Sequence, residues 1–478
     1  MKVLMVTHGF PHRELGGAEI YSYDLARTLI SEGLEVTVFS RTVDLASRDY
    51  TVFEEYVDGI SVIRVVNNFN DLYTFFNGFI NRQIAGVFSR ILEERRPDLV
   101  HFQHLFSLSG NLPYIARYKG IPSVLTLHDY WYICPKVNLF RPDYTVCPGP
   151  EDGFACADCN SQPGSTAAEA VALASFFDRH PLLKQYARRF VPGRIKNIIK
   201  KVVYRAGTSN QVTEVRPSVV DPVRVMEFFF RLEYLKSQLA HCACLISPSQ
   251  YLKKRYETLG YGNIKYLPLG IQKVAPGPDR IEGDEVVVGF VGNITATKGF
   301  SLLIDELNRL NDLDGIRIEI HGQIYDTLFY ERCIASLKDS FRKKLVYKGR
   351  FDRNPDSLAG VYHGLDAVVF PSLCEENAPL VVREAISAGT PVIASNRGGT
   401  PEVVRHGLNG LLFDPALPGD LAEKIRMFCN DRDLRKSLMK GARDTHVVDI
   451  KEHAKSLMEL YEQVMGSEGR NGSRFPGQ

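Results

Sequence analysis

The chain has 478 residues, of which 44% are hydrophobic and 24% are charged, and its formal net charge is +2. This length is too great for one ordinary core, so it predicts two or three domains of soluble, globular composition. The balanced charge argues against a nucleic-acid partner, and no apolar run approaches the roughly 18 residues that a membrane span needs.

The first residues, MKVLMVTHGF, contain an apolar stretch that is too short for a signal peptide and is better interpreted as a first strand. We therefore expect a cytoplasmic protein whose nine cysteines stay mostly reduced.

The first third of the chain alternates short β-rich runs with helical patterns such as 18–33. The strand candidates are, in chain order, 2–7, 35–40, 98–103 and 123–128. This alternation predicts a parallel sheet covered by helices.

The alternation stops at about residue 130, and we expect an insertion over about 134–230 in the first domain. It holds a segment rich in Cys, Pro and Gly, 134–159, and a basic stretch, 181–205. A helix through VMEFFFRLEYLKSQLAHC and a strand at 244–249 follow.

A polar segment with two Pro and two Gly, 272–285, is the best linker candidate. Six strand candidates follow it: 286–292, 316–322, 344–349, 366–372, 391–395 and 410–413. We expect a first domain over 1–271, a second over 272–448, an amphipathic helix over 449–465 and a disordered tail over 466–478.

Ligands of such sheets bind beyond the carboxyl ends of the strands, so the strand-to-helix loops should carry the chemistry. In the first loop, THGFPHRELGGAE, Gly16 and Gly17 allow a close approach of an anion to the next helix N-terminus. The loop FVGNITATKGF adds Lys298, a cation for a phosphate. The alternatives are an ordinary glycine turn and a surface lysine.

The segment LTLHDYW places His128 and Asp129 just past a buried strand. A histidine there can donate a hydrogen bond or orient a hydroxyl, although many histidines are purely structural.

Acidic residues lie on both sides of a helix start in CEENAPLVVREA, 374–385. We expect Pro379 at the first helical position, because its missing N–H would be unpaired there. Glu376 would then lie on the preceding loop and Glu384 in the second turn.

The free amides of Leu380 and Val381 at this helix start would point toward an anion. Carboxylates for hydroxyls beside amides for phosphate suit a nucleotide-sugar. A capped, solvated acidic helix start is the alternative.

With these pieces in order, the chain resembles the retaining glycosyltransferases of family 4, which have the GT-B fold. The segments that carry the resemblance are GGAE (16–19), HD (128–129), ISPSQYLKKRYETLGY to IKYLPLGI (246–271), FVGNITATKGF (290–300) and FPSLCEENAPLVVREAISAGTPVIASNRGGTPEVV (370–404). The resemblance implies an α/β fold of two Rossmann-like, doubly wound parallel-sheet domains that face a central cleft. The cysteine-containing insertion lies in the first domain, and the final helix crosses back to it.

The resemblance also implies three catalytic residues. Glu376 resembles the first acid of the Glu-x7-Glu motif, near the donor sugar hydroxyls. Lys298 resembles the basic residue that neutralises the donor diphosphate, and His128 resembles the first-domain histidine beside the transferred sugar.

The resemblance places the donor around these residues. Glu384 resembles the second acid, which binds the ribose, and the backbone at Arg350 and Phe351 looks like the nucleobase wall. Gly16 and Gly17 look like the loop that closes on the phosphates. The remaining donor-binding candidates are Asn293, Asn377, Leu380 and Val381.

Two departures from the family pattern reduce the expected phosphate contacts. Asn293 stands where the family usually has Arg, which leaves Lys298 as the main recognised cation. The glycine-rich EGFG of the family is replaced by ENAP, so Pro379 removes one amide donor.

The implied reaction transfers a sugar from a nucleotide diphosphate sugar to the hydroxyl of a sugar or lipid-linked saccharide, with retention and without a required metal or other cofactor. Its product would be a cell-surface polysaccharide or glycolipid. The alternatives are a nucleotide-sugar epimerase on the same fold and a non-catalytic nucleotide-sugar-binding protein.

Two features of the insertion suggest other contacts. Cys134, Cys147, Cys156 and Cys159 are candidates for a structural zinc site, or else free thiols in a loop. The basic stretch 181–205 has interleaved apolar residues and is either a solvated helix or a contact with an anionic membrane. The membrane reading would place the protein on the inner face of the membrane as a peripheral protein.

Overall fold

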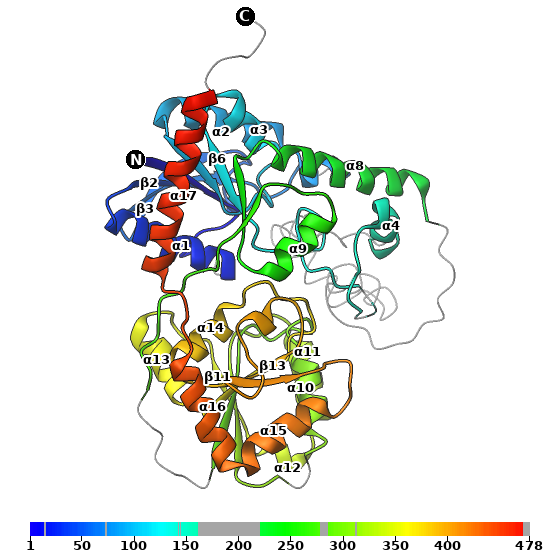
Figure 1. Ribbon diagram of the computed structural model, residues 1–478. Coiled ribbons are helices and arrows are strands. Elements are labelled where there is room, and N and C mark those ends of the chain that lie inside the picture. The colour runs from blue at the N-terminus through cyan, green and yellow to red at the C-terminus, as the bar shows by residue number, and fades with distance from the viewer. Residues whose placement is uncertain are drawn as a thin grey trace, which may run out of the picture. The chain divides into compact units, whose positions relative to one another are not determined.

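The chain divides into two compact units in a computed structural model (Figure 1). The structure describes residues 1–13, 16–71, 74–141, 143, 145–160, 220–277, 285–310 and 313–471. The first unit consists of 1–248, 252–268 and the chain from 451 on, and the second of 249–251 and 269–450. The predicted basic stretch 181–205 and the end of the predicted tail lie outside the described residues.

The first unit is built on an eight-stranded sheet in the order β3-β4-β2-β1-β5-β6-β7-β8. Its strands are β1 Lys2–Thr7, β2 Glu35–Thr42, β3 Val52–Val57, β4 Ile60–Val66, β5 Leu99–Phe102, β6 Ser123–Thr126, β7 Cys244–Ser247 and β8 Ile264–Tyr266. Neighbouring strands pair in parallel, except that β3 is antiparallel to β4. Sequence reasoning missed this hairpin, although Asp58 (φ 49°) and Gly59 (φ 83°) make the left-handed turn that an Asp-Gly pair favours.

Helices cover this sheet. They are α1 Gly17–Ser31, η1 Phe75–Gly78, α2 Arg82–Arg95, α3 Leu112–Tyr118, η2 Glu151–Gly153, α4 Phe154–Cys159, α8 Pro222–Leu239, α9 Gln250–Thr258 and α17 Ile450–Asn471. Buried hydrogen bonds anchor α17 to the sheet and to α1, because Tyr461 bonds His101 (2.6 Å) and His453 bonds Tyr21 (2.6 Å).

The final helix is longer than predicted, since α17 continues from 465 to Asn471. Gly466 is tolerated inside a helix at a cost of about 1 kcal/mol, and the next proline comes only at Pro476. The described residues contain no helix that is long and apolar enough to cross a membrane.

The second unit has a six-stranded, entirely parallel sheet in the order β11-β10-β9-β12-β13-β14. The strands are β9 Val286–Val291, β10 Ile316–His321, β11 Leu345–Gly349, β12 Ala367–Phe370, β13 Val392–Ser395 and β14 Gly410–Phe413. Every residue of β9, VVVGFV, is buried, as expected for a strand whose two faces are covered.

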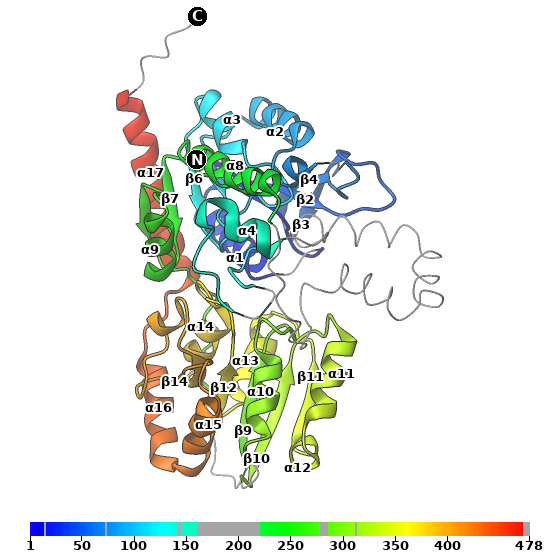
Figure 2. The ribbon, with the colours of Figure 1, turned by 90° about the vertical axis from the view of Figure 1, so that its right-hand side faces the viewer.

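Helices lie on both faces of this sheet (Figure 2). They are α10 Phe300–Leu307, α11 Thr327–Ser336, α12 Asp339–Arg342, α13 Pro355–His363, α14 Leu380–Ser387, η3 Thr400–Glu402, α15 Asp420–Asn430 and α16 Arg432–Asp444. The prediction of two parallel-sheet α/β domains is therefore confirmed.

The second unit begins slightly before the predicted boundary at residue 272. Ile271 already belongs to it, because its carbonyl accepts a hydrogen bond from Ile450 N (2.9 Å) and its N–H donates to Val448 (3.2 Å). Residues 249–251 also join this unit through Glu402, whose carboxylate accepts from the backbone N–H groups of Gln250 and Tyr251.

Candidate functional site

In the second unit, the loops after β9 and β12 are fastened together. Gly299 (φ 74°) lies against the chain at Pro371, where a Cβ would stand 1.8 Å from the carbonyl oxygen. Leu373 N donates to Thr297 O at 2.9 Å. Only glycine fits at position 299, so the two loops that carry the predicted donor residues have a fixed spacing.

These loops bring the two predicted catalytic residues of this unit together. Lys298 Nζ lies 2.7 Å from Glu376 Oε1, and Ser372 Oγ donates to the same oxygen at 2.7 Å. Burial alone would lower the pKa of Lys298, but the Glu376 carboxylate raises it above its ordinary value. Lys298 is therefore positively charged at neutral pH.

Glycines on a third loop hold the backbone of Glu376. At Gly398 (φ 60°) a Cβ would lie 2.2 Å from the Glu376 carbonyl oxygen, and Gly399 N donates to that oxygen at 2.7 Å. The Gly-Gly pair after β13 thus positions the acid.

Glu384 lies in the second turn of α14, with its side chain 3% exposed. Arg353 forms an ion pair with one carboxylate oxygen, and the hydroxyl of Tyr362 donates to the other at 2.7 Å. Burial, and then the Glu384 carboxylate, raise the pKa of Tyr362. Sequence reasoning found Glu384 and missed both partners, since no spacing rule links them to α14.

Pro379 is the N-cap of α14 rather than its first helical residue, so the prediction was one position off. Its extended conformation (φ −64°, ψ 118°) starts the helix at Leu380, and no side chain caps this end. The backbone N–H groups of Leu380 and Val381 belong to the first turn, which has no intrahelical acceptors for them.

The other predicted donor-binding residues have different surroundings. Asn377 is buried, and its Oδ1 accepts from Ser249 Oγ at 2.6 Å. Phe351 is half-buried and 6.3 Å from His321 between ring centroids, whereas Asn293 and Arg350 are exposed.

In the first unit, the predicted His128 is a neutral imidazole. Its Nε2 lies 2.8 Å from Gln103 Oε1, and its ring packs against Tyr21. Burial, together with repulsion from His104, lowers the pKa of His128 to about 3.

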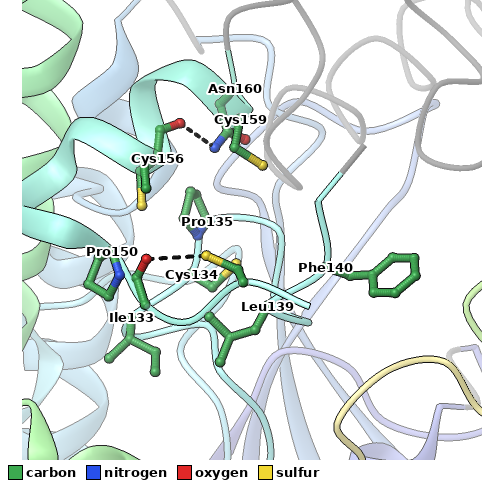
Figure 3. A pocket seen from close by; sticks show the side chains of 12 residues that line it. Ile133, Cys134, Pro135, Leu139, Phe140, Pro150, Cys156, Cys159 and Asn160 are labelled. Atoms are coloured by element: carbon green, nitrogen blue, oxygen red, sulfur yellow. Dashed lines mark hydrogen bonds between the residues drawn. The ribbon is translucent and has the colours of Figure 1, made fainter. Parts of the chain in front are cut away.

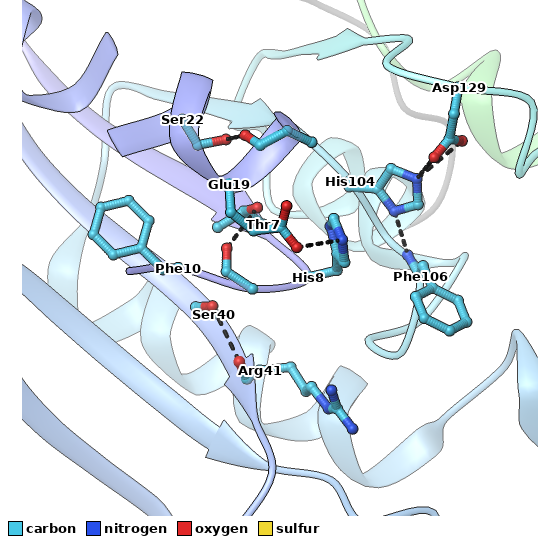
Figure 4. Close-up of polar contacts among 12 residues, drawn as sticks. Thr7, His8, Phe10, Glu19, Ser22, Ser40, Arg41, His104, Phe106 and Asp129 are labelled. Carbon is cyan, nitrogen blue, oxygen red and sulfur yellow. Dashed lines mark hydrogen bonds and ion pairs between the residues drawn. The ribbon is translucent and has the colours of Figure 1, made fainter. Parts of the chain in front are cut away.

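Two histidine–carboxylate pairs lie at the carboxyl ends of β1, β5 and β6 (Figure 4). His8 Nε2 is 2.9 Å from Glu19 Oε1, and His104 Nε2 is 3.0 Å from Asp129 Oδ2. The two imidazole rings are in contact, with centroids 4.4 Å apart. We call these four residues the histidine–carboxylate cluster.

Hydrogen bonds fix the tautomer of His104, because Phe106 N donates to its Nδ1 at 3.0 Å. Its Nε2 therefore carries the proton and donates to Asp129. For His8, Nδ1 is buried and has no hydrogen-bond partner among the described residues.

Opposite charges hold the first pair of the cluster together. Burial alone would raise the pKa of Glu19, but His8 lowers it to about 2. Burial alone would lower the pKa of His8, yet Glu19 raises it. Asp129 behaves similarly, because burial opposes its ionisation while His104 lowers its pKa.

Glu19 also occupies the space at Gly16 that we predicted for a phosphate. A Cβ on Gly16 would lie 2.4 Å from Glu19 Oε2, so this glycine makes room for the carboxylate. His8 and His104 were missed, although both directly follow a buried strand, the position that singled out His128.

The four predicted zinc ligands, Cys134, Cys147, Cys156 and Cys159, do not point toward a common centre. No three His, Cys, Asp or Glu side chains within the described ranges are arranged so that they could hold a metal ion.

Comparison with known families gives two matches. Residues 272–445 match the family model described as "Glycosyl transferases group 1", and residues 15–146 match that of "Glycosyltransferase Family 4". Together these ranges cover more than half of the 478 residues.

Curated relatives include the D-inositol 3-phosphate glycosyltransferase of Corynebacterium jeikeium, 29% identical over 45% of this chain and 54% of the relative. The lipopolysaccharide 1,2-N-acetylglucosaminetransferase of Salmonella typhimurium is 28% identical over 40% of this chain and 54% of that protein. The chain thus spans about half the length of the curated relatives it matches.

Solved structures resemble the chain over nearly its whole length. Sucrose-phosphate synthase from Thermosynechococcus elongatus has a TM-score of 0.63 at 19% identity, covering 98% of this chain and 99% of that one. HepE from Anabaena, solved in complex with UDP, has a TM-score of 0.59 at 16% identity, covering 97% and 100%. These likenesses establish the fold.

Proposed function

Because the chain belongs to the group 1 glycosyltransferases and has the GT-B fold, we propose that it transfers a sugar from a nucleotide diphosphate sugar to an acceptor hydroxyl. The observation that carries this proposal is the second unit's pair of acids. Glu376 and Glu384, each paired with a cation, come before and after the uncapped start of α14.

The arrangement suits the three parts of such a donor. Glu384 is fixed by Arg353 and Tyr362, and each carboxylate oxygen keeps a second acceptor site for a ribose hydroxyl. Lys298 and the N–H groups of the first turn of α14 offer positive charge for the diphosphate. Glu376 can accept hydrogen bonds from the sugar once Lys298 turns to the phosphate.

The chemical step breaks the bond between the anomeric carbon and the leaving phosphate oxygen, and a new bond forms to the acceptor oxygen. The acceptor's proton passes to the leaving phosphate. Lys298 and the α14 amides stabilise the negative charge where it develops, which is the reason we propose a reaction without a required metal. We further propose that the acceptor attacks from the face that the phosphate leaves, so the configuration is retained.

In the first unit, we propose that the histidine–carboxylate cluster and His128 contact the acceptor and the transferred sugar. The Asp129 side chain is 34% exposed and can accept a hydrogen bond from a hydroxyl. Saccharides of polysaccharides or glycolipids are the acceptors we propose, a class supported by the Salmonella relative, which is a lipopolysaccharide N-acetylglucosaminetransferase. The UDP-glucose complex of HepE supports a nucleotide-sugar donor.

Incubation with a panel of UDP-, GDP- and ADP-sugars and saccharide acceptors tests the proposal. We expect acceptor-dependent release of a nucleoside diphosphate and a product whose anomeric configuration, read by proton NMR, matches that of the donor. An isomerised nucleotide-sugar formed without acceptor would instead identify an epimerase. An inverted product would contradict retention.

A further inference from the structure

The four cysteines of the insertion, which all lie within 134–159, line one small pocket (Figure 3). Cys134 and Cys147 lie on the connection between β6 and η2, and Cys156 and Cys159 lie on α4. The pocket has a volume of about 10 Å³, enough for one water molecule or ion. We call it the cysteine pocket.

Backbone hydrogen bonds fix the segments that carry these thiols. The segments that carry Cys134 and Cys147 pair as a short hairpin, in which Phe140 and Val146 pair in antiparallel fashion and Cys147 N donates to Leu139 O at 2.7 Å. Gly153 (φ 90°) packs α4 tightly against α8, where a Cβ would lie 2.6 Å from Phe229 N. A hairpin thus supplies two thiols and a helix the other two.

Donors and cations surround the four sulfurs. The backbone N–H groups of Leu139 and Lys136 lie near the Cys134 sulfur, and the Arg141 side chain lies near that of Cys147. The positive charge of Lys136 also acts on Cys159. Groups of this kind stabilise thiolates and are the usual surroundings of a metal ligand.

The strongest observation is the buried guanidinium of Arg231 on α8, which is 4% exposed. It donates to the carbonyl of Trp131 and lies over the rings of Trp131 and Phe79. Among the residues that the structure describes, no carboxylate pairs with this guanidinium. Cys134 and Cys156 are close enough that a negative charge on their sulfurs would stabilise it. A buried cation without an anion is strongly destabilising, so a negative group is expected beside it.

Neutral thiols cannot supply that charge. Coordination to zinc deprotonates cysteine outright. Four thiolates on one Zn²⁺ carry a net charge of −2, which the cations at positions 136, 141 and 231 offset.

We propose that Cys134, Cys147, Cys156 and Cys159 bind one zinc ion in a closed, structural site. Four sulfur ligands from a hairpin and a helix match the tetrahedral preference of zinc. The sulfurs of Cys156 and Cys159 point in different directions in Figure 3, so binding requires thiol side chains to rotate toward the pocket. Four protons leave to solvent as the four zinc–sulfur bonds form.

The test is the metal content of the full chain, produced without a polyhistidine tag in zinc-supplemented medium and dialysed. We expect about one zinc per chain by plasma mass spectrometry. The double variant Cys156→Ser/Cys159→Ser should hold less than about one tenth as much. The matched control is Cys333→Ser/Cys429→Ser, which removes two cysteines of the second unit and should retain the zinc.

X-ray absorption at the zinc edge keeps the proposal testable should the double variant fail to fold. The wild-type protein should show four sulfur neighbours at about 2.3 Å. The assignment would be overturned if the folded wild-type protein held no zinc, or held iron in its place. It would also be overturned if the Cys156→Ser/Cys159→Ser variant kept its zinc, or if the zinc had nitrogen or oxygen ligands. These readouts do not depend on the proposed sugar transfer.

Discussion

Replacing Arg353 with alanine should destabilise α14, because the buried Glu384 carboxylate loses its ion pair and keeps only the hydrogen bond from Tyr362. Glu384 is 3% exposed and Arg353 28% exposed at the side chain. Breaking a fully buried ion pair costs about 3–5 kcal/mol, and the partial exposure of Arg353 lowers our expectation to about 2–3 kcal/mol. The remaining hydrogen bond from Tyr362 (2.7 Å) is unchanged.

Hydrogen exchange read by mass spectrometry on peptides of α13 and α14 measures this change locally. A loss of 2–3 kcal/mol corresponds to exchange that is about 30- to 150-fold faster. Arg350→Ala, which removes an exposed arginine three residues away, is the matched control and should leave exchange unchanged. Exchange of α14 within about threefold of wild type in Arg353→Ala would refute the view that this ion pair holds Glu384.

Three further predictions concern the two sites. Glu376→Gln should lower kcat by about 100-fold in steady-state kinetics, while thermal denaturation should show little change in the melting temperature. Unchanged turnover would mean that Glu376 is not part of the active site. Gly398→Ala should lower the urea midpoint by more than Gly407→Ala, since both glycines have positive φ but only Gly398 (φ 60°) lies against the Glu376 backbone; equal effects would contradict this packing. The folded-state pKa of Glu19 is lowered to about 2, so its contribution to stability is present above its ordinary pKa of 4.5 and is lost as the pH falls toward 2. The free energies of unfolding of wild type and Glu19→Gln, measured by urea titration, should therefore differ at pH 6 and converge at pH 2. A difference that stays constant with pH would contradict the His8–Glu19 pair.

The sequence predicted the two sheets well because their strands are continuous apolar runs separated by helical patterns. It also located Lys298, Glu376 and Glu384, each next to a strand or helix end. It could not show that Lys298 and Glu376, 78 residues apart, form an ion pair, because that depends on Gly299 seating one loop on another.

Residues on segments without a local signal were missed. Arg353 and Tyr362 reach Glu384 only through the packing of α13 on α14. Arg231 comes to lie beside the thiols because α8 returns to the hairpin after the long insertion. His8 and His104 could have been found as His128 was, because each follows a buried strand. That position could not have shown that Glu19 fills the space at Gly16.

Titration of nucleotide-sugars into the protein by calorimetry tests the central claim most directly. At least one UDP-, GDP- or ADP-sugar should bind to wild-type protein, and Lys298→Ala should weaken that binding at least about tenfold. Lys344→Ala, which removes a lysine paired with Asp314 at the far end of β11, should leave it unchanged. Equal affinity in wild type and Lys298→Ala would contradict the placement of the donor diphosphate at the start of α14.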